Sequence, residues 1–162
     1  MAHERLATYL NDHLAGSVVA LELLDHLKGA YSEETLRGFF RELRADIAAD
    51  RDELEALMKA LNIDQSRTRK ASAWLTEKFT ELKLRFDDPK AGALLLLESL
   101  EALSLGIEGK RGLWKALAAT SKTTPSLQTA DYDRLQQRAQ QQRDRVEELR
   151  IKTALTALTV GG

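Results

Sequence analysis

Polar side chains interrupt the middle of four long apolar stripes, and they are the residues of this chain best suited to chemistry. They lie at or beside positions where each stripe would otherwise continue with an apolar residue. In chain order, these residues are His13, Ser17, Asp46, Asp50, Glu98, Glu101, Glu108 and Gln142. Carboxylates and imidazoles can bind metal ions, and they can also hydrogen-bond to one another. Because an unpaired buried polar group costs about 1–3 kcal/mol, the set indicates either a self-satisfied polar network or the remnant of a ligand site.

The stripes that carry these residues have the period of an α-helix. The clearest runs from Leu36 to Leu61 in steps of three and four residues, and Asp50 is its only polar member. The predicted helices span residues 4–27, 33–61, 66–86, 89–119 and 130–158. If the four long helices pack antiparallel, their midpoints meet at one depth. The polar residues would then form a single layer inside an apolar column.

The chain organisation predicts one domain over residues 1–162 with an all-α fold. Residues 62–88 connect the second long helix to the third, and they carry a shorter apolar stripe of their own. A connection of this length can cross from one end of a bundle to the other. We therefore predict a four-helix bundle with one crossover connection that carries an additional short helix.

Composition excludes several classes of function. The chain contains no cysteine, which rules out disulfides, thiolate zinc sites and cysteine nucleophiles. The net charge of -1 disfavours binding to nucleic acid, although Arg67, Arg69 and Lys70 form a basic turn beside Trp74. No apolar run approaches the length of a membrane span, so we expect no membrane association and a cytoplasmic protein. Three histidines and no recognisable Ser/His/Asp constellation make a conventional hydrolase unexpected.

The pattern of helix lengths, crossover and inward polar residues resembles the ferritin-like superfamily. Proteins of that type place a glutamate on two helices and a Glu-x-x-His pair on the other two. The corresponding positions here are His13 or Ser17, then Asp46 and Asp50, then Glu101 with Glu98, and finally Arg138 and Gln142. The Glu-x-x-His motif is absent from the second and fifth predicted helices, and arginine has no lone pair to give to a metal.

The resemblance therefore implies a degenerate layer without a metal, and we favour no cofactor. In that case the buried carboxylates need cationic partners, for which Arg138, Arg145 and His13 are the candidates. The alternative is a mononuclear iron or manganese site with an atypical ligand set of His13, Asp50 and Glu101.

Two further features have more than one interpretation. His26 follows Glu22 by one helical turn, which suits half of a metal clamp or a favourable charge near a helix C-terminus. The segment from Gly106 to Lys110 superficially resembles a phosphate loop, but it lacks the glycine spacing and the hydroxyl after lysine. Its glycines, together with Gly112, indicate tight packing against a neighbouring helix or a kink; with Trp114 they could instead border a small-molecule pocket.

We predict a non-enzymatic protein, with no catalytic residues, that acts through protein–protein contacts. The stripe of the crossover helix is the expected surface for a homo-oligomer such as a dimer, or for another protein partner. Its residues are Trp74, Leu75, Phe79, Leu82 and Phe86. The alternative function is a metal-binding oxidoreductase or an iron-handling protein.

Overall fold

The chain folds into helices, as the sequence predicts. The computed structural model describes residues 2–65, 73–88 and 92–160, and no strand occurs among them. The elements are α1 (Ala2–Ala30), α2 (Glu34–Ala60), α3 (Ala73–Arg85), α4 (Gly92–Ser121), a 3-10 turn η1 (Pro125–Leu127) and α5 (Tyr132–Ala157). The predicted starts of the third and fourth helices, at residues 66 and 89, lie outside the described residues. The prediction of an all-α fold is confirmed.

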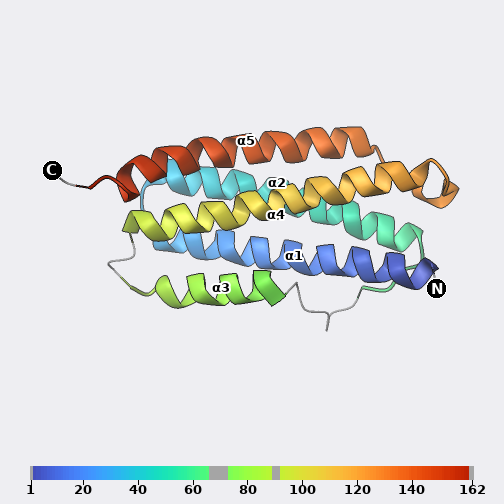
Figure 1. Cartoon of the computed structure of the whole chain (residues 1–162), viewed down its shortest axis with the longest axis horizontal. Coiled ribbons are helices and arrows are strands. Elements are labelled where there is room, and N and C mark those ends of the chain that lie inside the picture. The colour runs from blue at the N-terminus through green and yellow to red at the C-terminus, as the bar shows by residue number, and fades with distance from the viewer. Residues whose placement is uncertain (1, 66–72, 89–91, 161–162) are drawn as a thin grey trace.

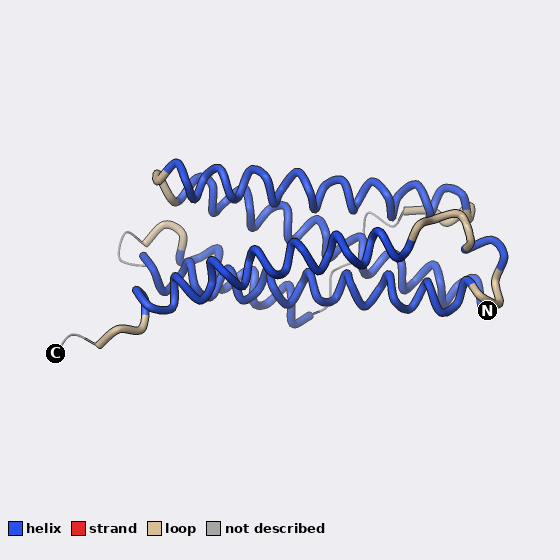
Figure 2. Tube along the Cα trace, turned by 90° about the horizontal axis from the view of Figure 1, so that it is seen from above, coloured by secondary structure: helices blue, strands red, loops and turns tan. Residues whose placement is uncertain are grey.

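The four long helices lie side by side along the long axis of the molecule (Figure 1). α1 and α5 run in one direction, and α2 and α4 run in the other. Two pairs pack most extensively, α1 with α2 and α4 with α5. The view in Figure 2, turned by 90°, shows the same alignment of the helices. None of the described helices combines the length and the apolar character that crossing a membrane requires.

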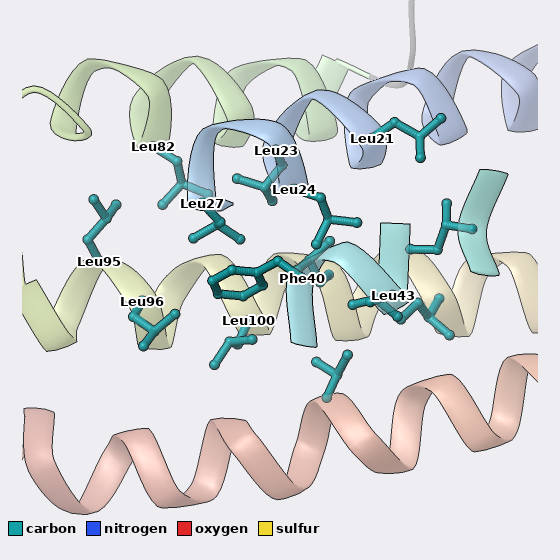
Figure 3. Close-up of a cluster of buried hydrophobic side chains, with 14 of the residues drawn as sticks. Leu21, Leu23, Leu24, Leu27, Phe40, Leu43, Leu82, Leu95, Leu96 and Leu100 are labelled. Atoms are coloured by element: carbon teal, nitrogen blue, oxygen red, sulfur yellow. The ribbon is translucent and has the colours of Figure 1, made fainter. Parts of the chain in front are cut away.

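The described residues form two apolar core clusters, one toward each end of the column. The first gathers residues such as Leu24, Phe40 and Leu100, and Figure 3 shows the Phe40 ring among leucines of α1 and α4. The second contains Leu10 and Trp114, with further residues from α2, α4 and α5. On α2, the first cluster ends at Ile47 and the second begins at Leu54, so the buried Asp50 lies between them.

Helix α3 lies along one half of the column, beside α1 (Figure 1). Leu82 is fully buried in the first cluster, and Phe79 and Phe86 pack against it. The His26 ring of α1 stacks on the Phe86 ring, with centroids 5.4 Å apart. Neither of the two interpretations of His26 from sequence included this contact.

The predicted self-association surface is thus partly used within the chain. Leu82 has no exposed surface to offer a second copy, and Phe79 and Phe86 are partly covered. The side chains of Trp74 and Leu75 lie outside the described part of the structure. Association through protein contacts stays a prediction.

Replacing Leu82 with alanine should lower the free energy of unfolding by about 2–5 kcal/mol, because the change leaves a cavity in the core. The matched control is Leu84→Ala on the same helix, since the Leu84 side chain is 77% exposed and its loss should change stability by less than about 0.5 kcal/mol. Urea unfolding followed by circular dichroism measures both. Equal, small effects would show that α3 is not docked on the column in solution.

Candidate functional site

A buried carboxylate joins three of the long helices at the middle of the column. Asp50 of α2 is 2% exposed, and its partners come from α4 and α5. The Gln142 amide donates to Asp50 Oδ2 at 2.8 Å, and Arg138 Nε donates to Oδ1 at 2.6 Å. Arg138 Nη2 also contacts Oδ1, without the alignment of a hydrogen bond. Lys110 Nζ donates to Oδ2.

Lys110 is the residue that sequence reasoning missed. It lies in the glycine-containing segment of α4, and its ammonium group donates to both Asp50 and the Gln142 side-chain oxygen. Burial lowers the pKa of Lys110, and the adjacent Asp50 carboxylate opposes that shift. The result is one carboxylate shared between two cations, Lys110 and Arg138, with Gln142 bonded to both Asp50 and Lys110.

Next to this cluster lies a cavity of about 440 Å³ between α1, α2, α3 and α4. Its lining is mostly apolar, and it includes Leu23 of α1, Phe79 of α3 and Leu103 of α4. Asp50 and Lys110 form part of its wall. The cavity therefore brings a large apolar surface and a buried charged group together.

Glycines of α4 keep this space open. Gly106 and Gly109 line the cavity, and a Cβ atom built on either one meets no atom within 4 Å. The same holds for Gly112, which does not line the cavity. The expectation of tight packing at these glycines is wrong, because among the described residues no neighbouring atom lies within 4 Å of a Cβ built there. Trp114, the suggested border of a pocket, does line the cavity.

Two of the predicted residues of α1 face the same cavity. His13 and Ser17 both line it, but the Ser17 hydroxyl donates to the Leu14 carbonyl at 2.6 Å and so is satisfied within its own helix. The His13 ring packs edge-on against Tyr9, with centroids 4.8 Å apart. Burial lowers the pKa of His13 below its ordinary value of 6.5, and Asp12 partly opposes the shift.

The three glutamates predicted for the layer do not join it, which corrects the expectation for α4. The inward face of this helix is occupied by Leu100, Leu103 and Ile107, so the glutamates point toward its flanks. Each forms an ion pair there: Glu98 with Arg85, Glu101 with Arg150 and Glu108 with Arg111. At the depth of Asp50, α4 contributes Lys110 instead.

Asp46 lies one turn before Asp50, and its carboxylate pairs with Arg145 of α5. Its side chain is 40% exposed, so Asp46 lies at the edge of the polar layer, in contact with solvent. The two arginines that the sequence suggested as partners, Arg138 and Arg145, thus bind Asp50 and Asp46 of α2, respectively.

The three residues suggested as metal ligands are not assembled. Asp50 is occupied by cationic partners, and Glu101 lies on the surface beside Arg150. Within the residues that the structure describes, no group of three or more histidine, aspartate or glutamate side chains is arranged to hold a metal ion. The site is therefore an ion-pair cluster beside an apolar cavity.

No family model matches the chain, and neither a curated protein nor a solved structure shows significant similarity to it. The resemblance to the ferritin-like superfamily therefore stays a prediction from the sequence pattern.

Replacing Asp50 with leucine should lower the free energy of unfolding by about 3–5 kcal/mol, because Lys110 would be left as an uncompensated buried charge. The matched control is Asp46→Leu, one turn earlier and also paired with an arginine of α5. Since that pair is partly solvated, its loss should cost less than about 1 kcal/mol. Chemical denaturation at neutral pH measures both, and equal losses would contradict the special role of Asp50.

Stability should fall as the pH drops below 6.5, with His13 as one cause. The pKa of His13 is lowered in the folded protein, so the unfolded chain binds a proton more readily and acid favours unfolding. Above the ordinary pKa of 6.5 this contribution vanishes. Substituting His13→Gln should therefore reduce the loss of stability between about pH 7.5 and about pH 5. Urea midpoints at the two pH values test this, and parallel losses in both proteins would contradict it.

Proposed function

We propose that the protein binds a small, largely apolar molecule in the cavity beside Asp50 and Lys110. The observation that carries the proposal is the cavity itself, whose volume of about 440 Å³ falls within the roughly 300–1,000 Å³ typical of ligand sites. Such sites are mostly apolar and have a few polar groups that orient the ligand. The cavity has this combination, since its wall is mostly apolar and Lys110, Asp50 and His13 are among the polar residues that line it.

Covering the apolar wall with a ligand is favourable. Asp12, Leu105 and Gly109 of the lining are exposed, so the cavity is open to solvent. Removing apolar surface from water contributes about 25 cal/mol per Å². The apolar lining also offers water few hydrogen-bond partners, so an apolar ligand would replace water there with a gain in free energy.

The finer fold assignment is part of the proposal. We infer a four-helix bundle of ferritin-like connectivity, in which the connection from α2 to α4 returns along the column and carries α3. Support comes from the parallel directions of α2 and α4, which place the end of one and the start of the other at opposite ends (Figure 1). In this bundle the middle of the column serves as a site for a small molecule, where the ferritin type holds metal ions.

A neutral fluorescent probe, N-phenyl-1-naphthylamine, tests the cavity without involving charge. We expect saturable binding to the wild-type protein and at least about tenfold weaker binding to Gly106→Leu, because the new side chain would fill the space that the glycine leaves. The matched control is Gly112→Leu, since Gly112 lies on the same helix and its Cβ direction is equally open, but it does not line the cavity.

Both substitutions should leave the protein folded, because leucine has the higher helix propensity. Circular dichroism and thermal unfolding verify this before the titrations. The absence of saturable binding to the wild type, or an equal loss in the two variants, would contradict the proposed function.

A further inference from the structure

The two ends of the cavity differ in character. α1 and α4 run in opposite directions (Figure 1), so Leu23 of α1 lies toward the same end as Leu103 of α4. Phe79 and Leu82 of α3 line that end as well. Along α4, the wall from Leu103 to the far end at Trp114 covers about 16 Å at 1.5 Å per residue.

The opposite end is rich in hydrogen-bond donors. Trp114 is 1% exposed, and its indole Nε1 has no acceptor among the described residues. Arg51 Nε is also buried without an acceptor in that part of the chain, although it lies 3.8 Å from Glu55. The Lys110 ammonium carries three protons, and the hydrogen bonds to Asp50 and Gln142 use two of them.

The cluster of Asp50, Lys110 and Arg138 at this end carries one excess positive charge, while the Asp12 carboxylate, which also lines the cavity, is exposed to solvent. Lys110 and Arg138 share the single carboxylate of Asp50, which leaves one positive charge in the cluster without a counterion. Asp46, the other acidic group that acts on Lys110, is itself paired with Arg145. An uncompensated charge is unfavourable in a largely apolar interior. A monoanion beside Lys110 would neutralise this charge, and it would accept hydrogen bonds from the unused donors at this end of the cavity.

We propose that the ligand is an amphiphile with one carboxylate, whose head group binds at Lys110 and whose apolar chain extends toward Phe79 and Leu82. This inference rests on the proposed function, because it assigns a ligand class to the same cavity. A carboxylate matches the single excess charge more closely than a phosphate monoester, which carries about -1.5 to -2. At about 30 Å³ for each water-sized group, 440 Å³ holds roughly 15 non-hydrogen atoms, the size of a medium-chain fatty acid.

Isothermal titration with three ligands of equal chain length tests the head group. Dodecanoate, dodecanol and dodecylamine are titrated into the full chain below the concentrations at which they form micelles. We expect dodecanoate to bind at least about tenfold more tightly than dodecanol, and dodecylamine to bind more weakly than both. Equal affinities for all three would overturn the carboxylate inference but leave the proposed function intact. No binding of any of the three, together with no binding of the neutral probe, would overturn both.

Two variants locate the head group. Lys110→Met should abolish the preference for dodecanoate over dodecanol, while Asp50 keeps Arg138 and Gln142 as partners. The control is Lys115→Met, an exposed lysine on the same helix outside the cavity, which should keep the preference. Lys78 lines the cavity beside Phe79 and pairs with Glu81 at 3.7 Å. Loss of the preference in Lys78→Met but not in Lys110→Met would overturn the proposed orientation.

If Lys110→Met fails to fold, Lys110→Gln provides the same test, since the amide can still donate to Asp50 without carrying a charge. It should bind dodecanol and dodecanoate with similar affinity. A retained preference for dodecanoate in a folded Lys110→Gln variant would overturn the inference.

Discussion

The carboxylate of Asp50, buried between two apolar clusters, is the constraint on which the rest of the structure depends. A charge in such a place is tolerated only when cationic and hydrogen-bonding partners surround it. Lys110, Arg138 and Gln142 supply those partners from α4 and α5. The interaction joins α2 to the α4–α5 pair at one depth. If α2 were displaced along the α4–α5 pair by one helical turn, the charges would be separated. The cluster therefore favours a single alignment of the helices.

The same cluster connects the fold to the cavity. Lys110 must reach from α4 to a carboxylate on α2, and the glycines before it put no side chains into the space toward α1. α4 packs much more extensively on α5 than on α1. The space between the two helix pairs is therefore wide near the middle of the column, and α3 covers part of it with Phe79 and Leu82. The same packing of the helices thus produces both the apolar wall and the charged end of the cavity.

Sequence periodicity predicted those features of the structure that depend on one helix at a time. Asp50 stood out because it was the only polar residue of an otherwise apolar stripe, and the helix ranges followed from the same period. The prediction did not include Lys110, because it placed the glutamates of α4 in the polar layer. A signal was present, since Leu103, Ile107, Lys110, Trp114 and Leu117 follow one another in steps of three and four. A lysine in that stripe was the natural counterion for Asp50.

The sequence indicated the cavity only as one of the alternative interpretations of the α4 glycines and Trp114. The volume of the cavity depends on the distances between helices, and a stripe gives only the face that a helix buries. Glycines can mark a close approach or an open space, and the sequence cannot distinguish the two. The packing of His26 on Phe86 likewise depends on where α3 docks. The resemblance to the ferritin-like superfamily stays a prediction from helix lengths, the crossover connection and the polar positions of the sequence.

A double-mutant cycle between Asp50 and Lys110 tests the central claim most directly. Unfolding free energies are measured for the wild type, Asp50→Leu, Lys110→Met and the double variant. If the two groups form one buried pair, the double variant should be more stable than Asp50→Leu alone, with a coupling energy of about 1–3 kcal/mol. Additive effects, within about 0.5 kcal/mol, would show that the two side chains do not interact and would contradict the account.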